Sequence, residues 1–169
     1  MKIGTHGRIL SPDERALATR VFGPTLPPWG RILVDDGLGF HDAPYTLDGP
    51  PGFYVIHIGP KAYPDCTSTA LLPGFGRIDA IFIHEMTHVW QYGKGYNVKL
   101  SSMWAQTAGE GYGYVSGKPW DDYNVEQQAA IVEDWYTGGM SPKAAEFPYI
   151  DKVIRTGGGG NSSKPLVNL

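Results

Sequence analysis

The most restrictive feature of this sequence is an apolar run at residues 78–91 that contains the pattern His-Glu-x-x-His. Apolar side chains would cover most of the circumference of a helix here: Ile78, Ile81, Phe82, Ile83, Met86, Val89 and Trp90. A helix that is apolar on nearly all sides is buried. Residues four apart share one face of a helix, so His84 and His88 can converge on a single ion. Because buried imidazoles and carboxylates without partners are costly, we predict a bound metal.

The spacing of this pattern favours a catalytic zinc ion. Two imidazole ligands leave open positions on zinc for a third protein ligand and a water. Glu85 follows His84 directly and points to the flank of the helix, where it can reach a metal-bound water rather than the metal. A carboxylate so placed can take a proton from that water and deliver it to a leaving amine. We therefore predict hydrolytic chemistry with Glu85 as the general base.

A third zinc ligand is expected from a helix predicted at residues 124–137. The segment opens with an asparagine and has a glutamine three residues later, which is a capping pattern. Glu126 lies in the first turn, where the helix dipole favours an ionised carboxylate. Two alanines keep its face thin enough to approach the histidines, so we predict Glu126 as the ligand. Glu133, two turns on along the same stripe, is the alternative.

The tetrahedral oxyanion formed in peptide hydrolysis usually needs a hydrogen-bond donor in addition to the metal. Two candidates, Tyr112 and Tyr114, lie in the glycine-rich stretch between the two predicted metal-binding helices. Tyr123 and His57 are further candidates. Spacing alone selects none of the four, and we take Tyr114 as the working assignment.

The rest of the chain predicts a single α+β domain built from short elements. The 23 glycines and 14 prolines imply many turns. Besides the metal helix, the expected elements are helix 11–22, strand 31–34, loop 35–52, strand 53–59, loop 60–76, helix 98–108, helix 124–137 and a helical segment from Ser141 that Pro148 interrupts. The strand at 53–59 is the clearest one, with Tyr54, Ile56 and Ile58 expected to face the core.

Composition excludes several other classes of protein. A chain of 169 residues suits one domain, and its net charge of −3 without a basic cluster argues against a nucleic-acid partner. A single cysteine, Cys66, excludes an internal disulfide. The apolar runs are too short to span a membrane, and the first residues lack the apolar core of a signal peptide. We therefore expect a cytoplasmic location in the producing cell and no cleaved signal on any export route.

Several segments together resemble a known family. His84-Glu85-x-x-His88 with Glu126 opening a Glu-x-x-Ala helix is similar to the gluzincin metallopeptidases, whose third ligand is a glutamate. Many of them carry an aspartate at the position of Ala130, which supports a histidine, so that role is unassigned here. The wider pattern also includes an early Leu-x-x-x-Glu…Val-Phe-Gly helix. Over roughly residues 10–137 it resembles metallopeptidase domains associated with type VI secretion, including those fused to VgrG-type spike proteins.

This resemblance implies a zincin-like metallopeptidase domain over residues 1–156, followed by a flexible glycine- and serine-rich tail at 157–169. It further implies an antibacterial effector toxin that reaches the periplasm of a target cell. The implied partners are a protein or peptide substrate, a secretion-apparatus spike and a cognate immunity protein. In zincins a strand edge beside the metal helix pairs with extended substrate. We expect that edge from the hairpin region of strand 53–59, directly or through a second strand on its solvent side.

Two other functions are compatible with the same metal motif. A zinc-stabilised binding or adaptor module that has lost catalysis would keep the metal but would not need Glu85. A cell-wall amidase would share the zinc chemistry and act on peptide links of the wall. The intact Glu85 argues against the first alternative.

Overall fold

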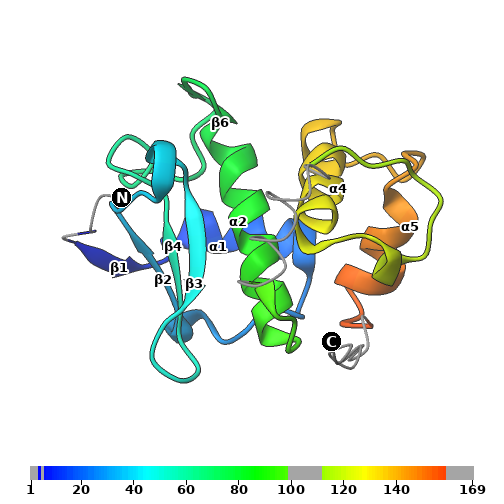
Figure 1. Cartoon of the computed structure of the whole chain (residues 1–169), viewed down its shortest axis with the longest axis horizontal. Coiled ribbons are helices and arrows are strands. Elements are labelled where there is room, and N and C mark those ends of the chain that lie inside the picture. The colour runs from blue at the N-terminus through cyan, green and yellow to red at the C-terminus, as the bar shows by residue number, and fades with distance from the viewer. Residues whose placement is uncertain (1–3, 5, 99–111, 159–169) are drawn as a thin grey trace, which may run out of the picture.

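The computed structural model describes residues 4, 6–98 and 112–158, which form a small mixed sheet packed against helices (Figure 1). The predicted combination of α and β structure in small elements is confirmed. The helix expected at 98–108 lies almost entirely outside the described residues, as does the tail from residue 159. In the described residues no helix has both the length and the apolar character needed to cross a bilayer.

The main sheet has four strands in the order β1-β2-β4-β3. Strands β2 and β4 pair in parallel, and the two outer strands pair antiparallel to them. β3 is therefore an edge strand, and it lies next to helix α2 (Figure 1). The strands are β1 Gly7–Ile9, β2 Ile32–Asp35, β3 Tyr45–Asp48 and β4 Tyr54–His57.

One face of this sheet packs on α2. Val34, Ile56 and Thr46 are neighbours in register across β2, β4 and β3, and all three are buried. Alternate residues of a strand point to opposite faces. The predicted core face of β4 is confirmed, since Ile56 and Ile58 are fully buried and Tyr54 is half-buried.

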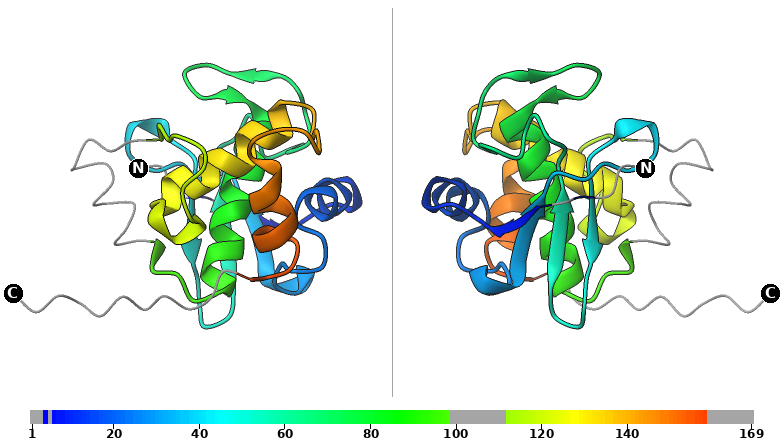
Figure 2. Two further views of the ribbon diagram at one scale, coloured as in Figure 1. Left: turned by 90° about the vertical axis from the view of Figure 1, so that its right-hand side faces the viewer. Right: turned by 90° about the vertical axis from the view of Figure 1, so that its left-hand side faces the viewer.

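The prediction of loop throughout residues 35–52 is wrong, because this region contains β3 and a 3-10 turn, Phe40–Asp42. All the ladder partners of β3 are in β4, so its strand character comes from tertiary pairing rather than from its own short sequence. Part of the loop predicted at 60–76 also forms a hairpin, β5 Leu71–Leu72 with β6 Gly76–Arg77. This hairpin projects from one end of the molecule (Figure 2).

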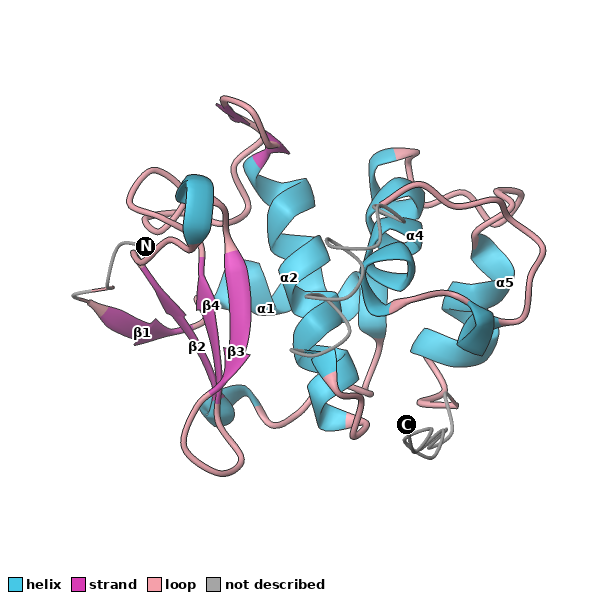
Figure 3. Cartoon of the chain, viewed as in Figure 1, coloured by secondary structure: helices cyan, strands magenta, loops and turns pink. Residues whose placement is uncertain are grey.

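The three long helices begin and end close to where the sequence predicts. Side chains cap α1 and α4 in reciprocal pairs, Ser11 with Glu14 and Asn124 with Gln127. These caps satisfy backbone N–H groups that the first helical turn leaves free. The helices are α1 Pro12–Phe22, α2 Ile78–Gly93 and α4 Val125–Thr137 (Figure 3).

The C-terminal segment differs from the prediction. Turns follow Ser141, and the helical part begins only at α5, Phe147–Tyr149, which continues into a π-helical turn, Ile150–Ile154. Pro148 therefore lies in the first turn of this segment and does not interrupt it. Proline fits there because the first N–H groups of a helix have no intrahelical partner.

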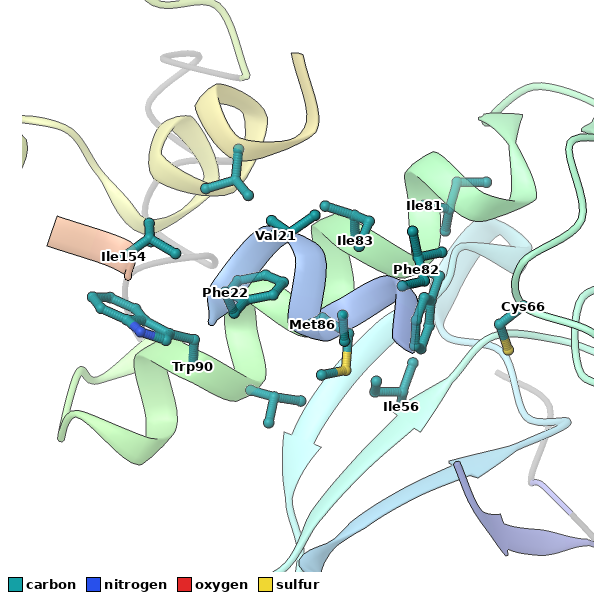
Figure 4. Packing of buried hydrophobic residues seen from close by; sticks show 14 of the residues in the cluster. Val21, Phe22, Ile56, Cys66, Ile81, Phe82, Ile83, Met86, Trp90 and Ile154 are labelled. Atoms are coloured by element: carbon teal, nitrogen blue, oxygen red, sulfur yellow. The ribbon is translucent and has the colours of Figure 1, made fainter. Parts of the chain in front are cut away.

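Helix α2 forms the centre of the core. Every residue from Ile78 to Gln91 is buried, which confirms the predicted central helix. Close up, Ile56 of β4 lies beside Met86 and Phe82 of α2 (Figure 4). With the sheet on one side and α4 packed along another, α2 holds the His-Glu-x-x-His residues between two different surfaces.

Candidate metal centre

Three predicted ligands meet between α2 and α4. Nε2 of His84 lies 3.3 Å from Oε2 of Glu126, and Nε2 of His88 lies 3.4 Å from the same oxygen. One donor atom from each residue falls within 4.8 Å of the others. All three residues are buried, with exposed fractions of 8%, 5% and 7%. We call this set the metal triad, and its geometry can accommodate a metal ion.

The local sequence explains why these side chains converge. Four-residue spacing stacks the two histidines on the face of α2 that packs against α4. The cap at Asn124 fixes the start of α4, which makes Glu126 its second residue. Ala129 and Ala130 are buried on α4, and such small side chains let the two helices approach closely.

His84 is held from its other nitrogen by Glu133. The distance from Nδ1 of His84 to Oε2 of Glu133 is 2.9 Å. An imidazole that donates from Nδ1 to a carboxylate presents the lone pair of Nε2 to a metal, and such partners orient metal-bound histidines. Glu133, the alternative ligand of the sequence analysis, thus lies at Nδ1 of His84 and outside the metal triad, where it can orient the imidazole.

His88 is held by an amide instead. Oε1 of Gln91 lies 2.7 Å from Nδ1 of His88, while Nε2 of Gln91 donates to the carbonyl of Val125 and to Oε1 of Gln128, both at 2.9 Å. Because the amide nitrogen faces two acceptors, the amide oxygen must face His88. Nδ1 of His88 is then the donor, and its Nε2 lone pair points to the triad. Sequence reasoning missed Gln91, whose signal is its position one turn after His88.

The pKa values of the three triad residues are shifted by burial and by the charges of their neighbours. Burial by itself would lower the pKa of both histidines. Hydrogen bonding to Glu126 outweighs this and raises both, and with Glu133 the pKa of His84 rises to about 10. Burial would raise the pKa of Glu126, but the two histidines hold it well below the usual range. The two imidazole nitrogens and the carboxylate oxygen of the triad are therefore all stabilised by a nearby positive charge. Such a donor set fits a divalent transition-metal ion.

Glu85 lies beside the triad and faces the sheet. It is 5% exposed, and its Oε2 accepts a hydrogen bond of 2.7 Å from the hydroxyl of Thr46 on β3. Its negative charge contributes to the raised pKa of both histidines, which indicates proximity to their rings. The structure therefore places Glu85 next to the triad, outside the set of donor atoms that would hold the metal.

One of the candidate tyrosines lies next to the metal triad. The ring of Tyr112 meets the ring of His84 edge-on, with centroids 5.7 Å apart. Burial raises the pKa of its hydroxyl, and the nearby charges of Glu126, Glu85 and Glu133 raise it further. The side chain is also well exposed, so it lines the solvent side of the site.

The structure places the other three candidate oxyanion donors elsewhere. Tyr114, the working assignment, donates to Oδ2 of Asp134 at 2.8 Å. Tyr123 donates to a backbone carbonyl at 2.7 Å. His57 follows Ile56 on β4 and so faces away from α2, with its Nδ1 2.7 Å from Oδ1 of Asp35. Of the four candidates, Tyr112 is the one whose ring is seen in contact with a triad residue.

No family model matches the sequence, but one known protein and one solved structure are similar to it. In an alignment of 137 residues that covers 77% of this chain, it is 34% identical to the type VI secretion system spike protein VgrG2b of Pseudomonas aeruginosa. The chain spans 13% of that protein's length. The solved effector domain of P. aeruginosa VgrG2b has a similar fold, with a TM-score of 0.58 and 28% identity, over 86% of this chain and 83% of that one. This chain resembles the VgrG2b effector domain in both sequence and fold.

Proposed function

We propose that this chain is a zinc-dependent peptidase with a zincin-like fold and a gluzincin-type site, delivered as an antibacterial effector of type VI secretion. The observation that carries the proposal is the convergence of His84, His88 and Glu126, with Glu85 beside them. An adaptor that used zinc only for stability would need the triad but no carboxylate at its flank.

The residues of the site divide the chemistry between them. A zinc ion held by the metal triad would acidify a water and polarise the carbonyl of a peptide bond. Glu85 accepts a proton from the attacking water and passes it to the leaving amine. Tyr112, on the solvent side, donates a hydrogen bond to the developing oxyanion. Glu133 and Gln91 hold Nδ1 of the two imidazoles, so that both Nε2 atoms lie beside Glu126.

A strand edge beside the site supports a protein or peptide substrate. β4 lies between β2 and β3, so among the described strands the sheet edge next to the site belongs to β3, whose Thr46 contacts Glu85. The hairpin region of strand 53–59 thus supplies the edge through its antiparallel partner. An extended peptide could add to such an edge as a further strand, which would bring its backbone close to Glu85.

The likeness to VgrG2b supports the biological setting of the proposal. That relative is named as a type VI secretion spike protein, and the solved structure is named as its effector domain. By this analogy the chain would act with a spike, reach the periplasm of a target cell and be neutralised by an immunity protein in its producer.

Replacing Glu85 with glutamine tests the proposal most directly. Glutamine keeps the shape of the side chain but cannot act as a base, so the variant should bind zinc normally and lose activity beyond the roughly 10²–10⁴-fold typical of general-base catalysis. The measurements are zinc content, peptide cleavage and growth of a test bacterium that exports the protein to its periplasm. A zinc-loaded Glu85→Gln protein as toxic as the wild type would favour the adaptor alternative.

The same preparation separates peptidase from cell-wall amidase. Purified cell wall and a proteome digest are offered in parallel to zinc-loaded wild type, with Glu85→Gln as the control. We expect new peptide termini in the proteome digest that the control does not produce. Soluble wall fragments without protein cleavage would instead support the amidase.

A further inference from the structure

The inference concerns Thr46, a buried hydroxyl in a row of apolar side chains. Its neighbours in register on the α2 face of the sheet, Val34 and Ile56, are both fully buried hydrocarbons. Thr46 itself is only 6% exposed. Valine has the same shape as threonine and would continue the apolar row, so the hydroxyl is the feature that needs explaining.

The hydroxyl of Thr46 has a charged partner. It lies 2.7 Å from Oε2 of Glu85 and 3.2 Å from the backbone carbonyl of Glu85. A hydroxyl has one proton to donate, and the shorter contact to the carboxylate is the stronger because its acceptor is ionised. The edge strand β3 is thereby connected directly to the side chain of the proposed general base.

This contact distinguishes the two carboxylate oxygens of Glu85. Oε2 is occupied by Thr46, and within the described part of the chain no hydrogen bond engages Oε1. With Oε2 held by Thr46, Oε1 is the oxygen that can accept a proton from water.

We propose that Thr46 is a positioning residue, which fixes one oxygen of Glu85 and thereby presents the other to the attacking water. This inference rests on the proposed peptidase function. In this proposal β3 has two roles, because it positions the general base and also pairs with the substrate. A substrate strand that adds to β3 would lie against the strand that also holds the base.

Three variants isolate the hydroxyl. Thr46→Val removes it at constant shape, Thr46→Ser keeps it on a smaller side chain, and Thr46→Ala repeats the deletion in case valine prevents folding. The matched control is Thr87→Val. Thr87 is fully buried on α2, but its hydroxyl donates to the carbonyl of Ile83 at 3.0 Å.

The first measurement is steady-state cleavage of a pool of internally quenched fluorescent peptides by the zinc-loaded proteins. Thr46→Val should lower kcat roughly 10- to 100-fold, the effect of one hydrogen bond to a charged group. KM and zinc content should stay close to wild type, because this hydroxyl contacts Glu85 and belongs to no residue of the metal triad. Thr46→Ser should recover most of kcat, and Thr87→Val should keep it. A Thr46→Val enzyme with wild-type kcat would overturn the inference.

The second measurement needs no catalysis. The carbon-13 NMR signal of the Glu85 carboxyl group, assigned by its loss in Glu85→Gln, reports hydrogen bonding to that group. We expect the signal to move in Thr46→Val and to stay in place in Thr46→Ser, in both zinc-loaded and metal-free protein. If the wild type cleaves nothing, the proposed function fails while this signal still decides the Thr46 contact. An unchanged signal in Thr46→Val would refute the contact.

Discussion

This protein contains two clusters of charged side chains that differ in whether a cationic side chain belongs to the cluster. The Arg8 cluster, formed by Arg8, Glu14 and Cys66, contains its own cation. Arg8 donates from two nitrogens to the two carboxylate oxygens of Glu14, each at 2.7 Å. The donor atoms of the metal triad are two nitrogens and one oxygen within 4.8 Å of one another, and none belongs to a lysine or arginine. The first cluster therefore includes a cationic side chain, whereas the second could hold a metal ion.

The surroundings of Glu14 confirm that the Arg8 cluster is structural. Glu14 also accepts hydrogen bonds from the backbone of Ser11 and Cys66, which ties β1, α1 and the loop after β4 together. Burial would raise its pKa, but these bonds and Arg8 hold the pKa at about 2. Burial raises the pKa of the Cys66 thiol, so this cysteine remains a neutral core side chain. No group in this cluster is left for a ligand.

The largest expected effect is on the metal triad. His88→Ala removes one of three protein ligands, and zinc affinity should fall roughly 10³-fold or more. Glu14→Gln disturbs the other charged cluster, whose carboxylate is fully buried, yet zinc affinity should not change. Competition with a chromophoric chelator measures both. Full zinc retention by His88→Ala would mean that the two clusters do not differ in the way described.

A second prediction concerns acid stability of the Arg8 cluster. The pKa of Glu14 is about 2 when folded and 4.5 ordinarily, so its ionised form stabilises the fold above pH 4.5. That contribution, roughly 3 kcal/mol, is lost as the pH falls from 4.5 toward 2. Glu14→Gln resembles the protonated side chain.

Urea unfolding of both proteins with a chelator present measures this effect. The difference in free energy of unfolding between wild type and Glu14→Gln should therefore be large at pH 6 and shrink toward pH 2. The chelator keeps the metal triad from contributing through bound ions. A difference that stays constant with pH would show that Arg8 does not depend on the charge of Glu14.

The smallest of these effects concerns the partners of the histidines. Glu133→Gln should weaken zinc binding about 10- to 100-fold, the usual cost of losing a group that orients a ligand. Glu126→Ala should cost considerably more because it removes a ligand. Asp134→Asn, the adjacent carboxylate on α4, is the matched control and should leave zinc binding unchanged. Equal losses in the Glu133 and Glu126 variants would make Glu133 a ligand and reassign the triad.

The sequence predicts those parts of the fold that local chemistry determines. Capping pairs at Ser11 and Asn124 locate two helices, and the apolar run around His84 locates the buried one. β3 escaped prediction because four residues in a glycine- and proline-rich region become a strand only through pairing with β4. The position of Pro148 is also mispredicted, because whether it interrupts or begins a helix depends on where the preceding turns end.

The candidate site divides along the same line. Spacing within one helix brings His84 and His88 together, and the capped start of α4 adds Glu126. Thr46 lies on another element than Glu85, so no local pattern links the two, whereas Gln91 is one helical turn after His88 and that spacing is its signal. Tyr112 and Tyr114 are two residues apart in a glycine-rich stretch, where the backbone path decides which ring lies against His84.

The orientation of the Gln91 amide has a consequence for which sequences this site can tolerate. Its nitrogen faces the carbonyl of Val125 and the side-chain oxygen of Gln128, and its oxygen faces His88. A glutamate has the same size, and it would serve His88 just as Glu133 serves His84. It would nevertheless turn a second carboxylate oxygen against two acceptors. A carboxylate can therefore serve His84 but not His88. Position 91 is restricted to an amide by the backbone carbonyl of Val125, which lies outside the metal triad.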